Sequence, residues 1–166
     1  MMKTLFYGIV SLMAFFLPIN ADEITGFWKT YNEKTKKPES VIAIYTYEGK
    51  QYGKIIGSYN KEGVINDSIY DPKDRATGVK GNPYYSGLDI IYDLHLSGSK
   101  YKGKIMDPRN GKVYSAELGT RNGDLVVTGK LLIFKSSRVW KAAQESDFTA
   151  AFPKPDVHTF VPVVAR

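Results

Sequence analysis

Short segments in which apolar and polar residues alternate are the feature that most constrains the fold of this chain. Between residues 88 and 97, every second side chain is apolar and most of the others are polar. A period of two indicates a strand with one buried and one solvated face, as in antiparallel sheets. The segment 124–134 alternates less cleanly, because Val126, Leu132 and Phe134 lie on its polar face. We predict one strand over each segment.

Six more strands are predicted where Ile, Val, Tyr and Phe are abundant. They span residues 27–31, 41–47, 52–59, 101–106, 113–118 and 137–141. Most of the connections are short and contain a Gly that can adopt positive φ, as at Gly49, Gly98, Gly111 and Gly123. Eight strands joined by hairpins predict an all-β fold, a single eight-stranded antiparallel up-and-down barrel, because closure removes the exposed sheet edges.

The first 21 residues have the pattern of a secretory signal peptide. Lys3 precedes an apolar stretch over residues 5–19, and Ala21 is a small residue at the predicted cleavage site. The stretch is shorter than the about 20 apolar residues of a spanning helix, so cleavage is favoured over a membrane anchor. We therefore expect an exported protein that does not span the membrane. The chain has no Cys, so a hydrophobic core rather than disulfides must hold the fold together.

The part of the chain after the leader is long enough for one domain with a core of its own. We assign residues 22–141 to the barrel. Residues 142–166 contain Pro153, Pro155 and Pro162, which interrupt regular structure. This segment is predicted to be a loosely structured C-terminal tail.

The formal net charge of the chain is +6, but its basic residues are spread along the sequence. Lys100, Lys102 and Lys104 alternate with less polar residues, which is typical of a solvated strand face. Solubility explains a charge distributed in this way without an anionic macromolecule. We therefore expect no nucleic-acid partner.

Residues suited to catalysis or metal binding are few. The chain has no Cys, no Gly-x-Ser-x-Gly motif and two His residues, His95 and His158, far apart in the sequence. A Ser-His-Asp triad or a zinc site would need more than these residues offer. We expect no enzyme activity, no cofactor and no metal site, although Asp67, Asp71 and Asp74 leave calcium open as an alternative.

Residues 60–86 form the longest predicted connection. Long connections inside a compact domain are usually functional or disordered. This one contains acidic, basic and aromatic side chains that could form a binding surface. The candidates are Asp71, Arg75, Tyr84 and Tyr85.

The segment 107–112, Asp-Pro-Arg-Asn-Gly-Lys, has the residues of a rigid hairpin. Pro108 restricts φ and Asn110-Gly111 suits a tight turn, so turn chemistry alone explains the segment. In an alternative interpretation, Asp107 and Arg109 form a polar clamp at the mouth of the barrel.

The start and the end of the predicted barrel resemble the lipocalin signature. Gly26-Phe27-Trp28 lies just after the leader, and Arg138 lies on the last predicted strand. In lipocalins and the wider calycin group, a Trp closes one end of the barrel and an Arg packs across its indole, a favourable cation–π arrangement. The resemblance implies these structural roles for Trp28 and Arg138.

Residues 22–140 resemble a family of small exported bacterial proteins known only as a domain of unknown function. The motifs that carry the resemblance are Gly26-Phe27-Trp28, Tyr52-Gly53-Lys54-Ile55, Gly87-Leu88-Asp89-Ile90, the segment Gly103 to Tyr114, and Arg138-Val139-Trp140. Lys141 follows Trp140 where the family commonly has an Arg. The resemblance implies a calycin-like barrel in the periplasm and no established activity.

We expect the barrel to bind a small apolar or amphipathic ligand. The 12 Tyr residues suit a cavity that is apolar with a few hydroxyl groups. The same residues could instead fill a small barrel completely, and the 60–86 loop would then serve as a protein-interaction or envelope-maintenance surface. The ligand-lining candidates are Ile90, Tyr92, Leu94, Tyr101, Leu125 and Val127.

Overall fold

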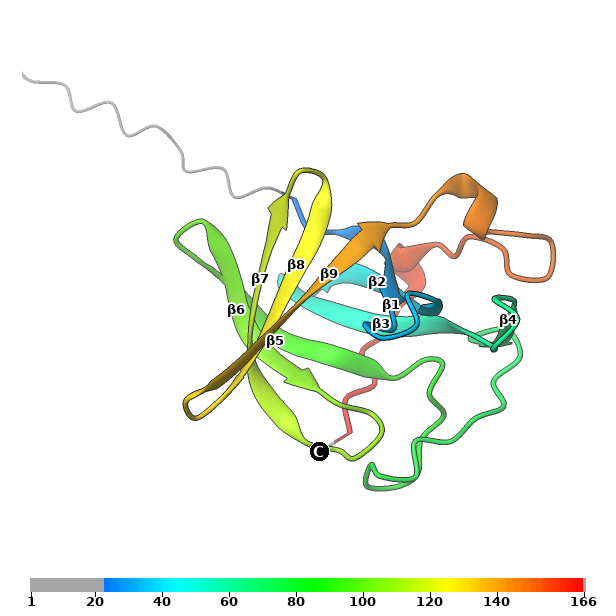
Figure 1. Cartoon of the computed structure of the whole chain (residues 1–166), viewed down its shortest axis with the longest axis horizontal. Helices are drawn as coiled ribbons and strands as arrows, with labels where there is room; N and C mark the ends of the chain where they lie inside the picture. The colour runs from blue at the N-terminus through cyan, green and yellow to red at the C-terminus, as the bar shows by residue number, and fades with distance from the viewer. Residues whose placement is uncertain (1–22, 166) are drawn as a thin grey trace, which may run out of the picture.

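The computed structural model describes residues 23–165, so the predicted leader, residues 1–21, lies outside the described part. Within it, nine strands form one antiparallel sheet, and eight of them close into a barrel (Figure 1). The strands are β1 (Gly26–Tyr31), β2 (Pro38–Tyr47), β3 (Lys50–Tyr59), β4 (Ile65–Ser68), β5 (Asp89–Ser97), β6 (Lys100–Met106), β7 (Val113–Arg121), β8 (Asp124–Leu131) and β9 (Phe134–Ala142). Two short 3-10 helices follow, η1 (Glu145–Asp147) and η2 (Val157–Thr159).

The ring follows the order of the chain except at β4. Successive strands pair antiparallel, β3 pairs with β5, and β1 pairs with β9 to close the ring. β4 pairs with β3 and lies outside the ring. The predicted eight-stranded up-and-down barrel is confirmed, and every strand of the ring overlaps a predicted segment. β4 was not predicted, because its four residues lie inside the long connection.

The ring is incompletely paired at one seam. Of the nine residues of β9, only Lys141 and Ala142 pair with β1, opposite Lys29 and Trp28. Along its other edge, β9 pairs with β8 from Phe134 onward. β1 and β9 therefore part over residues 134–140, and the side chains of residues 134–139 are all exposed.

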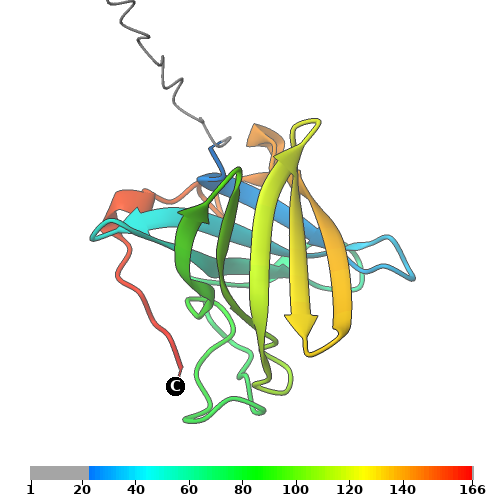
Figure 2. The same cartoon turned by 90° about the vertical axis from the view of Figure 1, so that its left-hand side faces the viewer.

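The direction of the strands sorts the connections into two ends of the barrel (Figure 2). The β2–β3, β5–β6 and β7–β8 turns lie at one end, together with the start of β1. The β1–β2, β6–β7 and β8–β9 turns lie at the other end, together with the connection from β3 to β5. We call the end with the β2–β3, β5–β6 and β7–β8 turns the closed end, and the opposite end the open end.

An apolar core fills the closed end. Trp28 is buried, and its indole N–H donates a hydrogen bond to the carbonyl oxygen of Ile24 at 2.9 Å. Trp28 belongs to the inner core, where it shares one cluster with Trp140. The cluster also contains Ile42, Ile44, Ile91, Leu94, Leu118 and Leu125.

The chain turns at Leu132-Ile133, where the sequence predicted an uninterrupted strand over residues 124–134. β8 ends at Leu131 and β9 begins at Phe134. Leu132 has a φ of +55°, in the left-handed region that Gly and Asn adopt most readily. The sequence prediction is wrong here because no Gly, Asn or Pro marks the turn.

The C-terminal tail packs on the outside of the barrel, so the prediction of a loosely structured tail is wrong. Phe152 is buried against Val41 and Ile56 in a second apolar cluster, on the outer faces of β2 and β3. A Cβ at Gly57 would come within 2.9 Å of the Phe152 ring, so the missing side chain lets the ring lie against the strand. The Pro residues of the tail prevent regular strands and helices, but they do not prevent close packing.

A buried ion pair fastens the tail to the barrel wall. The side chains of Lys54 and Asp89 are 5% and 0% exposed, and Nζ lies 2.7 Å from Oδ2. The Asp89 carboxylate also accepts hydrogen bonds from the Tyr45 hydroxyl at 2.9 Å and from the Val163 N–H at 2.7 Å. The Lys54 ammonium donates to the carbonyl oxygen of Val161 at 3.2 Å. Both charges therefore have partners in the tail.

Burial has a direct electrostatic effect on this pair. It raises the pKa of Asp89, and the charge of Lys54 opposes that rise. Asp89 lies on the polar side of the alternation over residues 88–97, and the tail covers this face of the strand. The pair is thus part of a core rather than of a solvated surface.

Replacing Asp89 with Asn is expected to lower the free energy of unfolding by about 3–5 kcal/mol, because Lys54 then keeps a buried charge without a counter-ion. The double variant Lys54→Met/Asp89→Asn removes that charge and should recover part of the loss. Urea denaturation at neutral pH measures both values. Asp71→Asn, which breaks the exposed Lys73–Asp71 pair, is the control and should leave stability unchanged. A double variant no more stable than Asp89→Asn would contradict this explanation.

Candidate functional site

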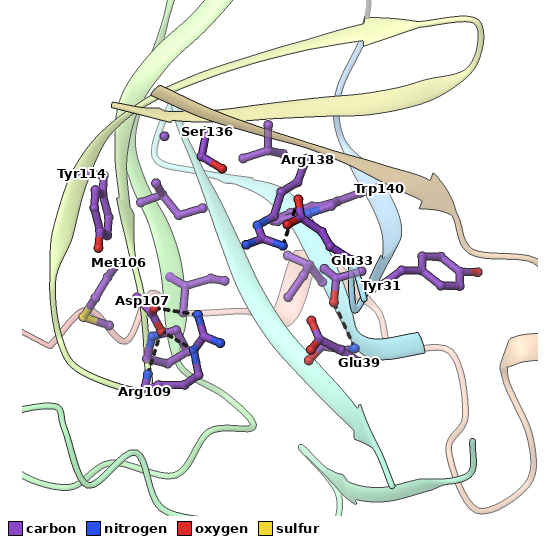
Figure 3. A pocket seen from close by; sticks show the side chains of 18 of the residues that line it. Tyr31, Glu33, Glu39, Met106, Asp107, Arg109, Tyr114, Ser136, Arg138 and Trp140 are labelled. Atoms are coloured by element: carbon purple, nitrogen blue, oxygen red, sulfur yellow. Dashed lines mark hydrogen bonds and ion pairs between the residues drawn. The ribbon is translucent and has the colours of Figure 1, made fainter. Parts of the chain in front are cut away.

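A cavity of about 990 Å³ lies in the open end of the barrel, bordered on one side by the seam between β1 and β9 (Figure 3). All eight strands of the ring contribute residues to its wall. The wall residues that are buried are all apolar: Ile42, Ile55, Ile90, Met106, Val127 and Trp140. The cavity therefore has an apolar interior made from the inner faces of the strands.

Charged side chains surround this apolar interior. Four of them are basic and three are acidic: Lys34, Arg109, Lys135, Arg138, Glu33, Glu39 and Asp107. The hydroxyl-bearing Tyr31, Tyr85 and Tyr114 also line the cavity. An apolar interior with a charged rim matches a molecule that has one apolar and one charged part.

Asp107 and Arg109 form a rigid pair on the β6–β7 turn. The Arg109 side chain donates from Nε to Oδ1 at 2.9 Å and from Nη2 to Oδ2 at 2.8 Å. These hydrogen bonds hold the pKa of Asp107 below its usual value. The segment 107–112 is a turn, as its residues predicted, and the same turn places both charged side chains at the cavity, as the alternative interpretation required.

The long connection packs against this turn through two glycines. A Cβ on Gly78 would lie 2.3 Å from the carbonyl oxygen of Arg109, and one on Gly111 would lie 2.6 Å from the carbonyl oxygen of Gly78. The two backbones can touch only because neither residue has a side chain. Farther along the connection, Tyr85 lines the cavity. Burial raises the pKa of Tyr85, and the charge of Asp107 adds to the rise, so its hydroxyl stays a hydrogen-bond donor.

Arg138 faces Glu33 across the seam rather than packing on Trp28. Its Nη1 lies 3.3 Å from Oε1 of Glu33, and its side chain is 45% exposed. Trp28 pairs in register with Ala142, four residues farther along β9. The role that the lipocalin resemblance implied for Arg138 is therefore wrong, because the register places its guanidinium at the cavity and not at the closed end.

The structure divides the six ligand-lining candidates. Ile90 and Val127 lie in the cavity wall. Leu94 and Leu125 are buried in the core, and Tyr101 packs against it while half-buried. Tyr92 lines a second hollow, of about 500 Å³. The candidates were chosen from alternation, which identifies the inner face of a strand but not the height of a residue along the barrel.

The four candidates of the 60–86 loop also lie in different places. Arg75 lies over the ring of Tyr84, with Cζ 3.4 Å from the ring centroid. Asp71 forms an exposed ion pair with Lys73 at 2.9 Å. Of the four loop candidates, Tyr85 alone lies in the cavity wall.

Several residues of the site escaped the sequence analysis. The cavity wall includes Trp140, Glu33 and Tyr114, none of which the sequence predicts as a site residue. The alternation between Arg138 and Trp140 places both on one face of β9, and this signal was present in the sequence. The position of Glu33 depends on the β1–β2 turn, which carries no comparable signal.

Clusters of acidic and His side chains that could bind a metal ion are absent from residues 23–165. No group of three or more His, Asp or Glu side chains there could hold a metal ion, so Asp67, Asp71 and Asp74 do not converge. His95 and His158 are both exposed. Over the same residues, no helix has the length and apolar character needed to cross a membrane.

The closed ring and its open-ended cavity define a lipocalin-like barrel. The chain belongs to the bacterial family described as "Uncharacterized protein conserved in bacteria (DUF2147)", whose model matches residues 26–142. A solved structure titled "Protein HP1028 from the human pathogen Helicobacter pylori belongs to the lipocalin family" is similar, with a TM-score of 0.57. The match covers 75% of this chain and 86% of that one, at 21% identity. At this identity the likeness concerns the fold alone, and no curated protein matches the chain.

The Asp107–Arg109 pair gives a titration prediction. The pKa of Asp107 should be measured below the ordinary value of 3.8 in the unmodified protein and should rise toward that value in Arg109→Gln. The stabilisation from the pair is therefore present above pH 3.8 and is lost as the pH falls through the lowered pKa. Carboxyl-carbon NMR titration measures the shift, and Arg75→Gln is the control. An unchanged pKa in Arg109→Gln would rule out the pairing as its cause.

Proposed function

We propose that this protein is an exported, periplasmic binding protein that holds a small amphipathic molecule in its barrel. The cavity of about 990 Å³, apolar inside and charged at its rim, is the observation that supports this proposal. Small-molecule sites are commonly about 300–1,000 Å³, with a few polar groups that fix orientation. The predicted leader supports export, and the compartment is part of the proposal.

The rim favours a ligand with an anionic head. Arg109 is held in two hydrogen bonds by Asp107, whereas Arg138 forms one exposed ion pair within residues 23–165, with Glu33 at 3.3 Å. An exposed ion pair contributes little stability, so an incoming carboxylate or phosphate can displace Glu33 at small cost. The planar guanidinium of Arg138 can then bind the head in two hydrogen bonds. The apolar part would lie against Ile42, Val127 and the neighbouring apolar wall.

The alternative, a filled barrel that acts through its 60–86 loop as a protein-interaction or envelope-maintenance module, has less support. A cavity at the open end leaves room that a filled barrel would not have. In the loop, Tyr84 is partly covered by Arg75. We propose binding rather than catalysis, because the cavity is apolar inside and charged at its rim.

Filling the cavity should abolish binding without damaging the barrel. Gly129 lies in the wall, and a Cβ added there would meet its neighbours at ordinary distances of 3.8 Å. Gly129→Phe is therefore expected to raise the Kd for ANS, an anionic amphipathic dye, at least about tenfold. Dye fluorescence measures the Kd. Val126→Phe, on the outer face of the same strand, is the matched control and should bind normally. Equal affinity in both variants would contradict binding in this cavity.

Arg138 is expected to favour ligands that have an anionic head group over uncharged ligands. In Arg138→Gln, the Kd for decanoate is expected to rise about tenfold, while the Kd for decanol, which has no charge, should change little. Competition against the dye measures both values. Arg121→Gln, which removes an exposed charge at the closed end, is the control. A similar loss for both ligands would show that Arg138 acts on the shape of the cavity and not on the head group.

A further inference from the structure

The β8–β9 hairpin ends in four exposed apolar residues, Leu131, Leu132, Ile133 and Phe134, which we call the apolar tip. Leu132 and Ile133 are 92% and 91% exposed. The hairpin reaches the edge of the molecule at the open end of the barrel (Figures 1 and 2). Scattered apolar residues are normal on a surface, but four consecutive ones on a protruding turn indicate a contact with an apolar partner.

The backbone conformation at the apolar tip is unfavourable for a large side chain. Leu132 occupies the first position of a two-residue turn with a φ of +55°. Two of the three hairpin turns at the closed end, Gly98-Ser99 and Asn122-Gly123, put Gly or Asn into such conformations, and the third puts the polar Glu48 there. A branched side chain at positive φ is strained, and strain of this kind is concentrated at functional sites. The sequence thus keeps apolar side chains where the turn itself would favour glycine.

Two lysines lie directly behind the apolar tip. Lys130 and Lys135 are opposite each other in the β8–β9 register, one step behind the pair Leu131 and Phe134. Like charges directly opposite each other destabilise a strand pair. Lys130 faces the carboxylate of Glu117 at 3.1 Å, whereas Lys135 forms no ion pair with the residues that the structure describes. This leaves a positive charge just behind an apolar end, an arrangement suited to a surface with apolar depth and anionic head groups.

We propose that the apolar tip inserts into an anionic phospholipid bilayer and holds the open end of the barrel against the membrane surface. A protein partner would ordinarily need about 20–30 residues on each side, and this hairpin offers four. A bilayer requires no matching shape, only apolar side chains to insert and cations at the level of the head groups. The proposal is independent of the ligand-binding function.

The position of the cavity relative to the apolar tip determines which part of the barrel would face the membrane. Leu131 and Phe134 belong both to the apolar tip and to the cavity wall. Insertion would therefore bring the wall into contact with lipid, so that an amphipathic molecule could pass between them without crossing water. The side of the barrel that carries the C-terminal tail is built from β2 and β3, away from the hairpin in the strand order.

A second two-residue turn of the same chain serves as the model for a test variant. Leu132→Gly/Ile133→Ser copies the Gly98-Ser99 turn, in which Gly98 has a φ of +64°, so it should preserve the hairpin and relieve its strain. The experiment is sedimentation of residues 22–166 with vesicles of equal parts phosphatidylcholine and phosphatidylglycerol, in parallel with pure phosphatidylcholine. Leu96→Ser, which removes a half-exposed Leu at the closed end, is the matched control.

We expect the unmodified protein and Leu96→Ser to sediment with the anionic vesicles, and the glycine–serine variant to lose at least about tenfold in partition coefficient. Lys135→Gln should weaken binding to anionic vesicles only, and added salt should do the same. An unchanged melting temperature and unchanged ANS affinity in the glycine–serine variant would show that the fold and the cavity are intact. Lack of sedimentation by the unmodified protein, or equal sedimentation by the glycine–serine variant, would overturn the proposal. So would a dimer that dissociates in this variant, because the apolar tip would then serve a second copy of the chain.

Discussion

The incomplete pairing of β1 with β9 is the constraint on which the rest of the structure depends. Two register pairs hold these strands together, and beyond them the strands part. An eight-stranded ring can be filled by its own side chains or can hold one small molecule, and the cavity here adjoins the part of the seam where the strands are unpaired. It also places Arg138 and Glu33 on opposite sides of the opening, where their charges face each other.

An open seam leaves a strand edge without partners and an end of the barrel without a core. Lys135 and Arg138 place charges along the free part of β9, which discourages pairing with another chain. The missing core is compensated elsewhere, since the tail builds a second apolar cluster around Phe152 on the outside of β2 and β3. The protein thus divides its stabilising contacts between the closed end and the outer wall, and the open end holds the cavity.

Alternation was sufficient to predict the ring, because most of its strands have one face toward an apolar interior. It fails within residues 88–97, where the register shifts between Tyr92 and His95, so that Ile91 is buried and Leu96 is half-exposed. It was insufficient wherever the position of a residue depended on contacts between segments that are distant in the sequence. Leu132-Ile133 has the composition of a strand, yet the chain turns there with a φ that leaves no trace in the sequence. The place of Arg138 depends on the register against β1. Proline content described the regularity of the tail correctly but gave no information on whether Phe152 would find a surface to pack against.

The fastening of the tail also has a consequence for the order of folding. Lys54 and Asp89 are synthesised about 70 residues or more before the backbone groups of Val161 and Val163 that complete their surroundings. A chain that emerges with its N-terminus first can assemble strands before then, but this part of the outer wall stays hydrated until residues 161–163 have emerged. The ion pair therefore gains its full set of partners only after the strands that carry it have been synthesised.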